Sequence, residues 1–496
     1  MQRLEAAFLS STNTVKRNGG YTPLLCVRAA HTSTQPHRRR LHSTGQDASA
    51  QAFTLANQPR PAPPAAAPPS PPVQDGVSML ALANLPLSQV LRTYLITTLS
   101  SSPALLSVST SVLRLMLESK SALFNVQKNP LLRWLLWETF YKQFCAGESK
   151  TQIDRTCAGL RQQGYAGVIL EYALEVLKDA EGHEATDVAV WRKGLLNTIE
   201  MSQPGDFVGL KWSGMGPAAL RRMLANEAPS ERMQEAMDTV CQAAKENDIS
   251  LLPAAEETNT LDAFFNWCMA MQRRYNTNGK AVVYNTYQAY LKSMPSWLST
   301  HLETAREQNF VLGAKLVRGA YLHNEKRNLI HDTIEDTHHA YDSLAAAMIH
   351  RDYNHLLQPA SETASAQNWP LTNVVLATHN ANTVTKMQAL RQTQHNASVP
   401  LTPLSFAQLQ GMADEVSCQL LAAAKADVGD AEAAKKGLLR EQVFKCTTWG
   451  TMTECLNYLL RRAAENKDAA SRTGESRRAM QAELWRRIKG VFGVGA

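Results

Sequence analysis

Apolar and polar residues follow two different patterns along the chain. Between Leu80 and Phe144 the apolar residues recur at three- and four-residue spacing, which predicts packed helices. From Gly164 onward, short apolar runs rich in β-branched residues alternate with amphipathic helical segments. The expected strands are 167–172, 207–214, 249–253, 281–288, 310–318, 374–380, 404–409 and 442–449.

Each expected strand is followed by a helical segment. The first helix is expected to run through Leu177, and the others to span 218–225, 261–275, 297–309, 335–350, 383–394, 411–426 and 454–465. Two extra helices are expected between the second and third strands, including one at 232–247. Repeated β-then-α units predict a parallel sheet. Eight such units in roughly 300 residues fit an α/β (β/α)8 barrel, similar to a TIM barrel, better than an open doubly wound sheet.

Polar residues stand at the carboxyl ends of most of the expected strands. They are Lys211, Glu256, Gln288, Arg318, Tyr321, Thr378, His379 and Asn380. Barrel enzymes carry their active sites at this end of the sheet. We therefore expect these side chains to surround one site.

The N-terminal region has the composition of a targeting signal. Residues 1–45 are rich in Arg and Ser and contain one acidic residue, Glu5, which is typical of a mitochondrial transit peptide. Residues 46–76 contain a Pro/Ala-rich linker that cannot pack a core. We assign 77–160 to an N-terminal helical arm and 161–496 to the barrel. No run of about 18 apolar residues predicts a membrane span, and Tyr94 to Leu117 favours two packed helices.

Composition narrows the function classes. The chain has 44% hydrophobic and 19% charged residues, which is ordinary for a globular protein. The formal net charge of +7 comes largely from the first forty residues, so the remainder predicts no nucleic-acid surface. The eight cysteines show no zinc-binding spacing, and the His331-Asp332 and His338-His339 pairs build no recognisable ligand set. We expect no metal.

Two adjacent arginines near the C-terminus suggest an acidic ligand. The segment Tyr458-Leu-Leu-Arg461-Arg462-Ala-Ala-Glu465 places two guanidinium groups on an otherwise apolar helix. Arginine grips a carboxylate in a planar fork, although an exposed helix face with an internal ion pair would have the same sequence. A second possibility is a Schiff-base lysine, Lys211 or Lys315, in an aldolase-like barrel. The residues alone leave these alternatives open.

Four motifs together resemble the proline dehydrogenase family, and most closely its fungal mitochondrial form. They are Lys315-Leu-Val-Arg318-Gly319-Ala320-Tyr321, Ala377-Thr378-His379-Asn380, Gln408-Leu409-Gln-Gly411-Met412 and the Tyr458 to Asn466 segment. The resemblance runs from about Gly164 to Thr473. It implies a distorted (β/α)8 barrel that binds FAD and oxidises L-proline to Δ1-pyrroline-5-carboxylate. It also implies transfer of electrons to ubiquinone from the matrix side of the inner mitochondrial membrane, with peripheral membrane contact.

The resemblance also implies roles for individual residues. Arg461, Arg462 and Lys211 would hold the proline carboxylate, and Tyr321, Leu409, Cys446 and Tyr458 would line the substrate ring. The cofactor would be held by Gln288, Lys315, Val317, Arg318, Gly319, Ala320, Thr378, His379, Asn380 and Glu465.

The chain departs from the family pattern at three positions. Ala254 replaces a frequent Asp, so that Glu256 or Glu257 would have to partner a basic residue of the site. Cys446 replaces the tyrosine that bacterial members place over the substrate ring, and Ile334 replaces a lysine near the cofactor phosphates. Oxidation of 4-hydroxyproline therefore stays open as an alternative.

Overall fold

The computed structural model describes residues 81–173, 182–429, 437, 439–465 and 470–493. The expected transit peptide (1–45) and linker (46–76) lie outside the described residues, as does the helix expected to run through Leu177. The boundaries drawn for these segments stay predictions.

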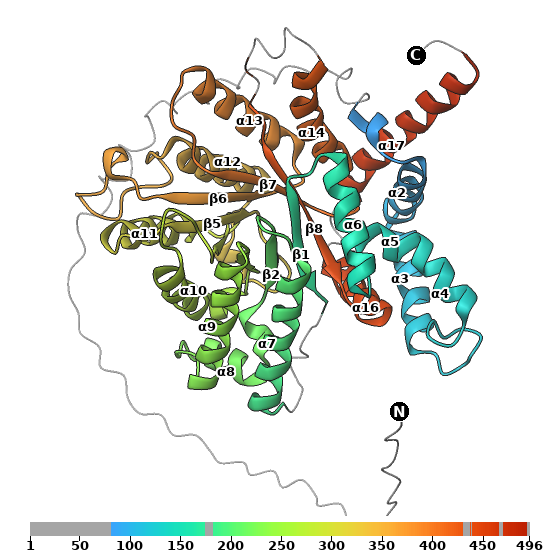
Figure 1. Ribbon diagram of the computed structural model, residues 1–496, viewed down its shortest axis with the longest axis horizontal. Coiled ribbons are helices and arrows are strands. Elements are labelled where there is room, and N and C mark those ends of the chain that lie inside the picture. The colour runs from blue at the N-terminus through green and yellow to red at the C-terminus, as the bar shows by residue number, and fades with distance from the viewer. Residues whose placement is uncertain (1–80, 174–181, 430–436, 438, 466–469, 494–496) are drawn as a thin grey trace, which may run out of the picture. The chain divides into compact units, whose positions relative to one another are not determined.

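Eight parallel strands form the centre of the molecule (Figure 1). They are β1 (Gly167–Tyr172), β2 (Phe207–Leu210), β3 (Ser250–Pro253), β4 (Asn285–Gln288), β5 (Leu312–Val317), β6 (Thr372–Ala377), β7 (Leu404–Leu409) and β8 (Gln442–Trp449). All eight expected strands are confirmed, although β2 and β4 are shorter than expected. Residues Trp212–Met215 form a 3-10 helix, η3, instead of continuing β2.

The strands follow the order β3-β2-β1-β8-β7-β6-β5-β4, as expected for a barrel in which the first and last strands pair. The remaining gap, between β3 and β4, is bridged just before β4. The amide of Leu251 donates to the carbonyl of Val282 at 2.6 Å, and the amide of Tyr284 donates to the carbonyl of Leu251 at 3.0 Å. The sheet is therefore a nearly closed, distorted (β/α)8 barrel, as predicted.

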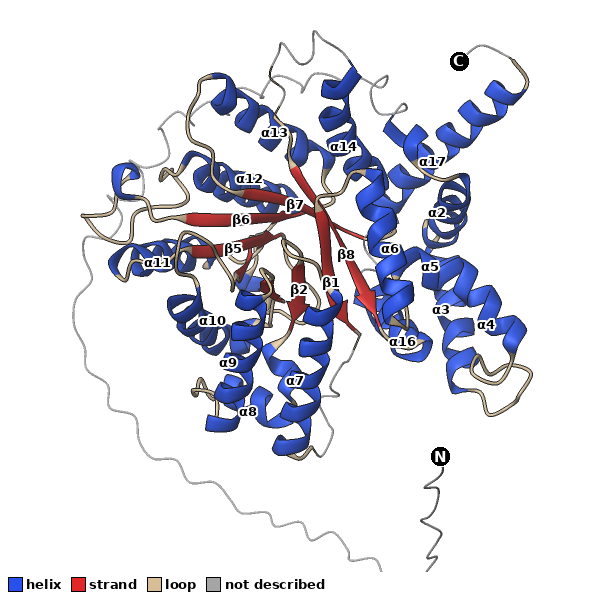
Figure 2. Cartoon of the chain, in the orientation of Figure 1, coloured by secondary structure: helices blue, strands red, loops and turns tan. Residues whose placement is uncertain are grey.

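Helices surround the strands (Figure 2). Those that belong to the barrel are α6 (Lys150–Gln163), α7 (Glu184–Met201), α8 (Pro217–Leu224), α9 (Glu231–Glu246), α10 (Leu261–Tyr275), α11 (Met294–Glu307), α12 (Ile334–His350), α13 (Ala381–Asn396), α14 (Asp414–Gly429) and α16 (Met452–Glu465). Of the two extra helices expected between the second and third strands, the one at 232–247 is α9. No described helix is both long enough and apolar enough to cross a membrane.

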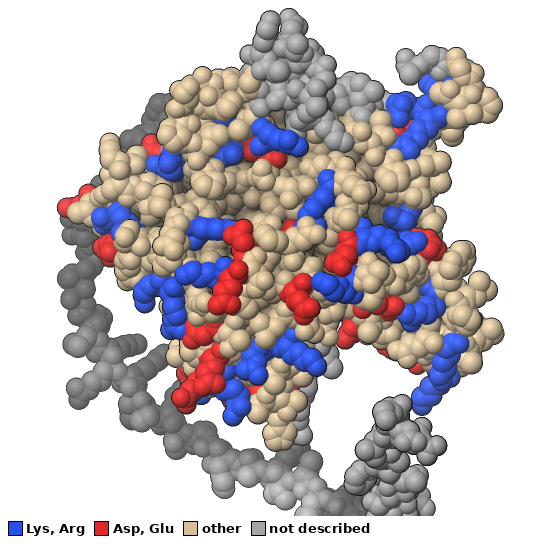
Figure 3. Space-filling model, in the orientation of Figure 1, with Lys and Arg blue, Asp and Glu red and all other residues tan. Residues whose placement is uncertain are grey.

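An N-terminal arm of helices packs beside the barrel. It consists of α2 (Leu87–Ser100), α3 (Pro103–Glu118), α4 (Pro130–Leu136) and a short π-helical turn that leads into α5 (Lys142–Phe144). The C-terminal helix α17 (Ala470–Val491) packs against α2. Figure 3 shows charged side chains of both signs interspersed over the face of the barrel in that view.

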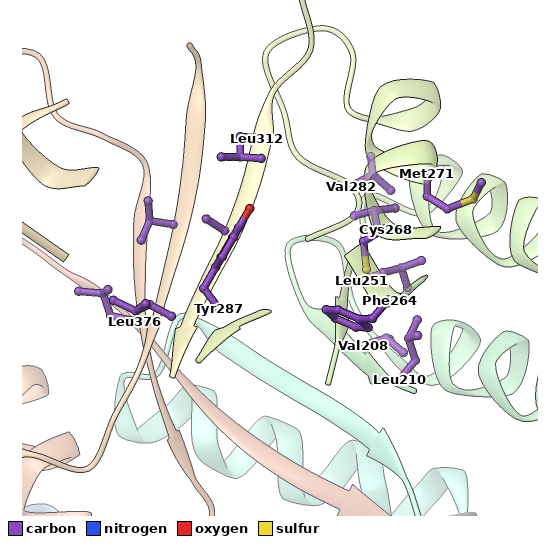
Figure 4. Packing of buried hydrophobic residues seen from close by; sticks show 14 of the residues in the cluster. Val208, Leu210, Leu251, Phe264, Cys268, Met271, Val282, Tyr287, Leu312 and Leu376 are labelled. Carbon is purple, nitrogen blue, oxygen red and sulfur yellow. The ribbon is translucent and has the colours of Figure 1, made fainter. Parts of the chain in front are cut away.

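The strands bury their two faces in two separate apolar clusters. Successive residues of a strand point to opposite sides, so Val168 and Leu170 pack outward against the helices, while Ile169 between them points into the barrel. Figure 4 shows part of the outer cluster, where Val208 and Leu251 approach Phe264. The interior cluster is smaller and consists of Ile169, Phe207, Leu252, Ala281, Tyr284, Val311, Val375, Ala407 and Phe444. Above it, the interior positions become polar.

Candidate active site

The polar residues continue the inward-pointing positions of the strands. Counting in steps of two from the interior apolar residues leads to the carboxyl end of the barrel. The positions reached there are Glu171, Lys211, Glu256, Gln288, Lys315, Val317, Leu409 and Cys446. The barrel is thus filled with apolar side chains at one end, whereas most of the inward positions at the other end are charged or polar.

Lys211, Tyr321 and Glu256 form a hydrogen-bonded and charged group. The Lys211 ammonium donates to the Tyr321 hydroxyl at 3.1 Å, and that hydroxyl donates to the carbonyl of Ala255 at 2.8 Å. Burial alone would lower the pKa of Lys211, but the Glu256 carboxylate and then Tyr321 outweigh it and raise the pKa above its ordinary value. Lys211 is therefore a permanent cation near neutral pH.

Glu256 supplies the carboxylate that Ala254 cannot. Its side chain is 6% exposed and accepts a 2.6 Å hydrogen bond from the Ser213 hydroxyl. Burial raises the pKa of this carboxyl. Glu257 instead accepts from Asn324 at 2.9 Å. Of the two candidates for the missing partner, Glu256 is the one whose charge acts on Lys211.

Gln288 ties two loops of the barrel mouth together. Its amide nitrogen donates to the carbonyl of Glu256 at 2.9 Å, and its amide oxygen accepts from the backbone of Ala320 at 3.1 Å. The side chain is fully buried. Gln288 therefore orients the segment that carries Gly319, Ala320 and Tyr321.

The glycine at 319 has a local explanation. A Cβ added there would lie 2.5 Å from the ring of Tyr290, so no larger residue fits without moving that ring. Val317, two residues earlier, ends β5 at an inward position and is partly buried. Close packing thus requires the small residue at 319 before any ligand is considered.

Glu171 is a residue of the site that the sequence analysis missed. It points into the barrel from β1, against Gly209, where an added Cβ would lie 2.4 Å from the Glu171 Cγ. Burial lowers the pKa of Lys315, and Glu171 opposes that shift by attracting the ammonium. Burial and then the Glu171 carboxylate raise the pKa of the Cys446 thiol. The inward phase of Glu171 on its strand was the signal that could have identified it.

Helix α16 brings two of the predicted residues, Tyr458 and Arg462, to the same rim. Tyr458 donates to the Glu171 carboxylate at 3.3 Å, and the Arg462 guanidinium lies 5.2 Å from the centre of the Tyr458 ring. Burial raises the pKa of Tyr458, and the Arg462 charge opposes that shift. Arg462 also acts electrostatically on Lys211 and Lys315. Arg461 is exposed, and Glu465 ends α16 with its side chain outside the described residues.

Arg318 lies on the outer side of the rim and joins three elements. Its guanidinium donates to Thr378 at 2.6 Å, to Thr383 at 2.8 Å and to Nδ1 of His338 at 2.9 Å. It also lies 4.4 Å from the centre of the Tyr341 ring. Because Arg318 links the end of β5 to α12 and α13, it fixes the geometry of this side of the mouth.

The segment after β6 begins a helix that points its N-terminus toward Arg318. Asn380 caps α13 by accepting from the amide of Thr383 at 2.9 Å, and the amide of Asn380 donates to the Thr378 hydroxyl at 3.1 Å. His379 accepts at Nε2 from the amide of Leu409 at 3.1 Å. The Leu409 side chain is 38% exposed at the end of β7, so an apolar contact surface remains at the mouth.

The donor set fits an anionic ligand. Lys211, Lys315, Arg318 and Arg462 lie at the mouth, with Arg461 exposed beside Arg462 on α16, whereas the described interior carboxylates there are Glu171 and Glu256. A helix N-terminus and a neighbouring guanidinium suit a phosphate group. The described residues contain no cluster of three or more potential metal ligands. Ile334 begins α12 with its side chain 64% exposed and brings no charge to the rim.

The chain is similar to known proteins of one family. The family model described as proline dehydrogenase matches residues 153–475. The probable mitochondrial proline dehydrogenase of Schizosaccharomyces pombe is 30% identical over 420 residues, covering 73% of this chain and 81% of the relative. Mitochondrial proline dehydrogenase 1 of Homo sapiens is 32% identical over 264 residues, covering 53% and 40%. Hydroxyproline dehydrogenase of Mus musculus is 27% identical over 408 residues, covering 72% and 83%.

A solved structure supports the fold. Proline utilization A from Bdellovibrio bacteriovorus, inactivated by N-propargylglycine, superposes with a TM-score of 0.54 at 13% identity, covering 79% of this chain and 41% of that chain. The chain therefore spans less than half of this protein and of the human relative. Because the family model matches well over half of its residues, the chain belongs to the proline dehydrogenase family of oxidoreductases.

Proposed function

We propose that the protein uses FAD to oxidise L-proline to Δ1-pyrroline-5-carboxylate. The observation that carries the proposal is the meeting of the Arg462 charge with the Lys211–Tyr321 pair at the barrel mouth. A carboxylate placed between these cations would be held from two sides of the barrel, because Arg462 comes from α16 and Lys211 follows β2.

The substrate would be bound by its acid group and its ring. Arg461, Arg462 and Lys211 would hold the carboxylate. Tyr321, Leu409, Cys446 and Tyr458 would line the ring and exclude water from it. Fixing the carboxylate orients the ring, and such positioning is the main contribution that a protein makes to a cofactor reaction.

The cofactor would be held along the rim from β4 to β6, and by the end of α16. The residues are Gln288, Lys315, Val317, Arg318, Gly319, Ala320, Thr378, His379, Asn380 and Glu465. When bound, FAD supplies the two-electron acceptor for the carbon next to the proline nitrogen. Lys315 and Arg318 would stabilise negative charge that develops nearby.

A visible spectrum tests the proposal directly. The purified protein should show flavin absorption that bleaches on anaerobic addition of L-proline, with Δ1-pyrroline-5-carboxylate as product. A colourless protein that forms a borohydride-trappable adduct would instead favour the Schiff-base aldolase alternative. For Lys211 that alternative has less support, because a Schiff-base lysine reacts as the neutral amine and the pKa of Lys211 is raised. The pKa of Lys315 is lowered by burial, so Lys315 is the lysine on which the borohydride test decides.

A second candidate substrate is 4-hydroxyproline. Two observations favour it: Cys446 occupies an inward position on β8, and hydroxyproline dehydrogenases are among the relatives. A thiol is smaller than a phenol, so a ring that carries a hydroxyl has more room. The ratio of kcat/KM for the two substrates separates these candidates.

The relatives named above as mitochondrial support a mitochondrial location. We infer that the protein works on the matrix side of the inner membrane and passes its electrons to ubiquinone. Deleting residues 1–45 should leave the protein in the cytosol with its flavin intact, and unchanged import would refute the transit-peptide assignment. Reduction of a soluble ubiquinone analogue by proline tests the acceptor.

A further inference from the structure

The N-terminal arm exposes an unusual number of large apolar side chains. Of the twenty-three large hydrophobic residues that are exposed in the described chain, nine lie between positions 105 and 135. They are Leu105, Val108, Val112, Leu115, Leu123, Phe124, Leu131, Trp134 and Leu135. A concentration of exposed apolar side chains of this kind on a globular protein marks an interaction site. We call these nine residues the arm patch.

The patch residues share one side of each helix. Those of α3 follow each other at spacings of three, four and three residues, and those of α4 lie at positions 131, 134 and 135. Residues at such spacings occupy one face of a helix. Leu123 and Phe124 belong to the turn between the two helices and are 65% and 52% exposed.

The opposite sides of the same helices are buried together. Leu113 of α3 and Leu136 of α4 join one apolar cluster with Met452, Cys455 and Leu456 of α16. Figure 1 shows α3 and α4 side by side, next to α16. Because both helices bury their inner faces in this shared cluster, their outer faces point away from it. The patch is therefore not needed to attach the arm.

Basic residues accompany the patch. Between positions 105 and 135 the chain has four cations, Arg114, Lys120, Lys128 and Arg133, and one acidic residue, Glu118. Arg133 pairs with Glu148 at 2.6 Å, but no ion pair joins Arg114, Lys120 or Lys128 to another described residue. A patch of Leu, Phe and Trp bordered by unpaired cations has the composition of surfaces that lie in a membrane interface.

We propose that the arm patch binds the surface of an anionic lipid bilayer, with Leu123, Phe124 and Trp134 at headgroup depth. The charge pattern favours lipid over a second copy of the chain. A symmetric interface would bring each of the unpaired cations toward an identical positive surface, whereas anionic headgroups neutralise them. The helices are too short to span the bilayer, so the contact is peripheral.

The location of the patch gives this contact a consequence for the enzyme. The arm packs on α16, the helix that carries Tyr458, Arg461 and Arg462. A bilayer bound at the patch would therefore lie one helix away from the rim of the candidate active site. An enzyme whose electron acceptor is dissolved in the membrane requires this arrangement. This consequence rests on the proposed function, whereas the lipid binding itself does not.

Flotation of the full chain with vesicles tests the inference. The probes are vesicles of phosphatidylcholine alone and of phosphatidylcholine mixed with phosphatidylglycerol. The patch variant is Leu123→Ser with Leu131→Ser, whose side chains are 65% and 69% exposed. The matched control is Leu224→Ser with Leu371→Ser, which removes two leucines that are 50% and 64% exposed on other elements. All variants keep the same N-terminal segment, so its basic residues contribute equally.

We expect the patch variant to lose about tenfold or more in partitioning onto the mixed vesicles, and the control to match the unmodified protein. Lys120→Gln with Lys128→Gln should lower binding to the mixed vesicles by roughly fivefold per charge and leave binding to neutral vesicles unchanged. Oxidation of proline with a soluble dye as acceptor should be unaffected in all variants. A protein without that activity would refute the proposed function but not the lipid contact.

Equal flotation of the patch variant and the control would overturn the inference. If the patch variant instead loses concentration-dependent self-association in sedimentation, with flotation unchanged, then the face joins two copies of the chain and the lipid assignment is wrong.

Discussion

The ammonium of Lys211 donates a 3.1 Å hydrogen bond to the hydroxyl of Tyr321, across the mouth of the barrel. Lys211 directly follows β2, whereas Tyr321 lies in the loop after β5, so the bond joins parts of the chain that are 110 residues apart. The Tyr321 hydroxyl in turn donates a hydrogen bond to the carbonyl of Ala255. One side chain thus positions the Lys211 ammonium and links it to the loop after β3.

Tyr321→Phe should weaken substrate binding without unfolding the protein. The change removes a hydrogen-bond partner of a charged group, which is worth about 1.5–3 kcal/mol. We expect kcat/KM for proline to fall roughly ten- to a hundredfold. Tyr275→Phe is the matched control. It also removes a tyrosine hydroxyl that donates to a charged group, Asp238 at 2.9 Å, but this bond joins α10 to α9. Equal kinetics in the two variants would exclude Tyr321 from the site.

Arg462→Met should raise the KM for proline steeply while the flavin stays bound. The change removes a charge-assisted contact to the carboxylate, worth about 1.5–3 kcal/mol or more, which corresponds to roughly a ten- to a hundredfold effect. Arg461→Met should behave similarly. Arg222→Met removes a partly exposed arginine that pairs with Glu227 at 3.1 Å, and it serves as the control. A normal KM in both variants of α16 would mean that the two arginines belong to a solvated helix face.

The pattern of residues predicted the barrel because each strand carries its own signal. Short β-branched runs separated by amphipathic helices specify parallel pairing, and the polar strand ends specified which end holds the site. The pattern predicts β2 through Gly214, since apolar character alone does not show where a strand ends. Residues Trp212–Met215 instead form η3, which turns the chain so that Ser213 reaches Glu256.

Side chains that meet across the barrel from distant parts of the chain could not be predicted from the sequence. The inward phase of Glu171 is visible in the alternation along its strand, but the register of β1 against β8 is needed to show that it shares the interior with Cys446. Likewise, Ala254 suggested a missing carboxylate, but the choice of Glu256 over Glu257 depended on which side chain points inward. Burial and side-chain direction are tertiary properties, whereas spacing is local.

Acid should destabilise the protein in part through His301. This ring is buried on α11, where its Nδ1 lies 2.9 Å from the Tyr287 hydroxyl. Burial lowers the pKa of His301 from 6.5 to about 3. The pKa of His301 is lower in the folded state than in the unfolded state, so the contribution of this group to stability is fully present above pH 6.5. That contribution is lost as the pH falls from about 6.5 toward 3, by up to about 1.4 kcal/mol per pH unit.

Urea unfolding at several pH values measures this effect. The asparagine of His301→Asn cannot take up the proton. The free energy of unfolding of this variant should therefore fall less steeply than that of the unmodified protein as the pH is lowered from about 6 to about 4. His350→Asn changes an exposed histidine and should keep the original slope. If both variants retain the slope, His301 is not the buried neutral group that titrates.

Cys446→Tyr should sharpen the preference for proline over 4-hydroxyproline. Cys446 occupies an inward position on β8, packs against the interior cluster and lies beside the Glu171 carboxylate. A phenol at this position would fill the space that a hydroxyl on the substrate ring requires, whereas the thiol leaves that space open. An apolar pocket rejects an added hydroxyl by roughly a hundredfold at most, so the unmodified protein should still prefer proline.

Cys446→Ser is the matched control, because it keeps the side chain small and should keep the tolerance of 4-hydroxyproline. The measurement is the ratio of kcat/KM for proline over 4-hydroxyproline in the three proteins. A ratio that does not rise in Cys446→Tyr would show that position 446 does not face the substrate ring, and the placement of the substrate beside β8 would then be wrong.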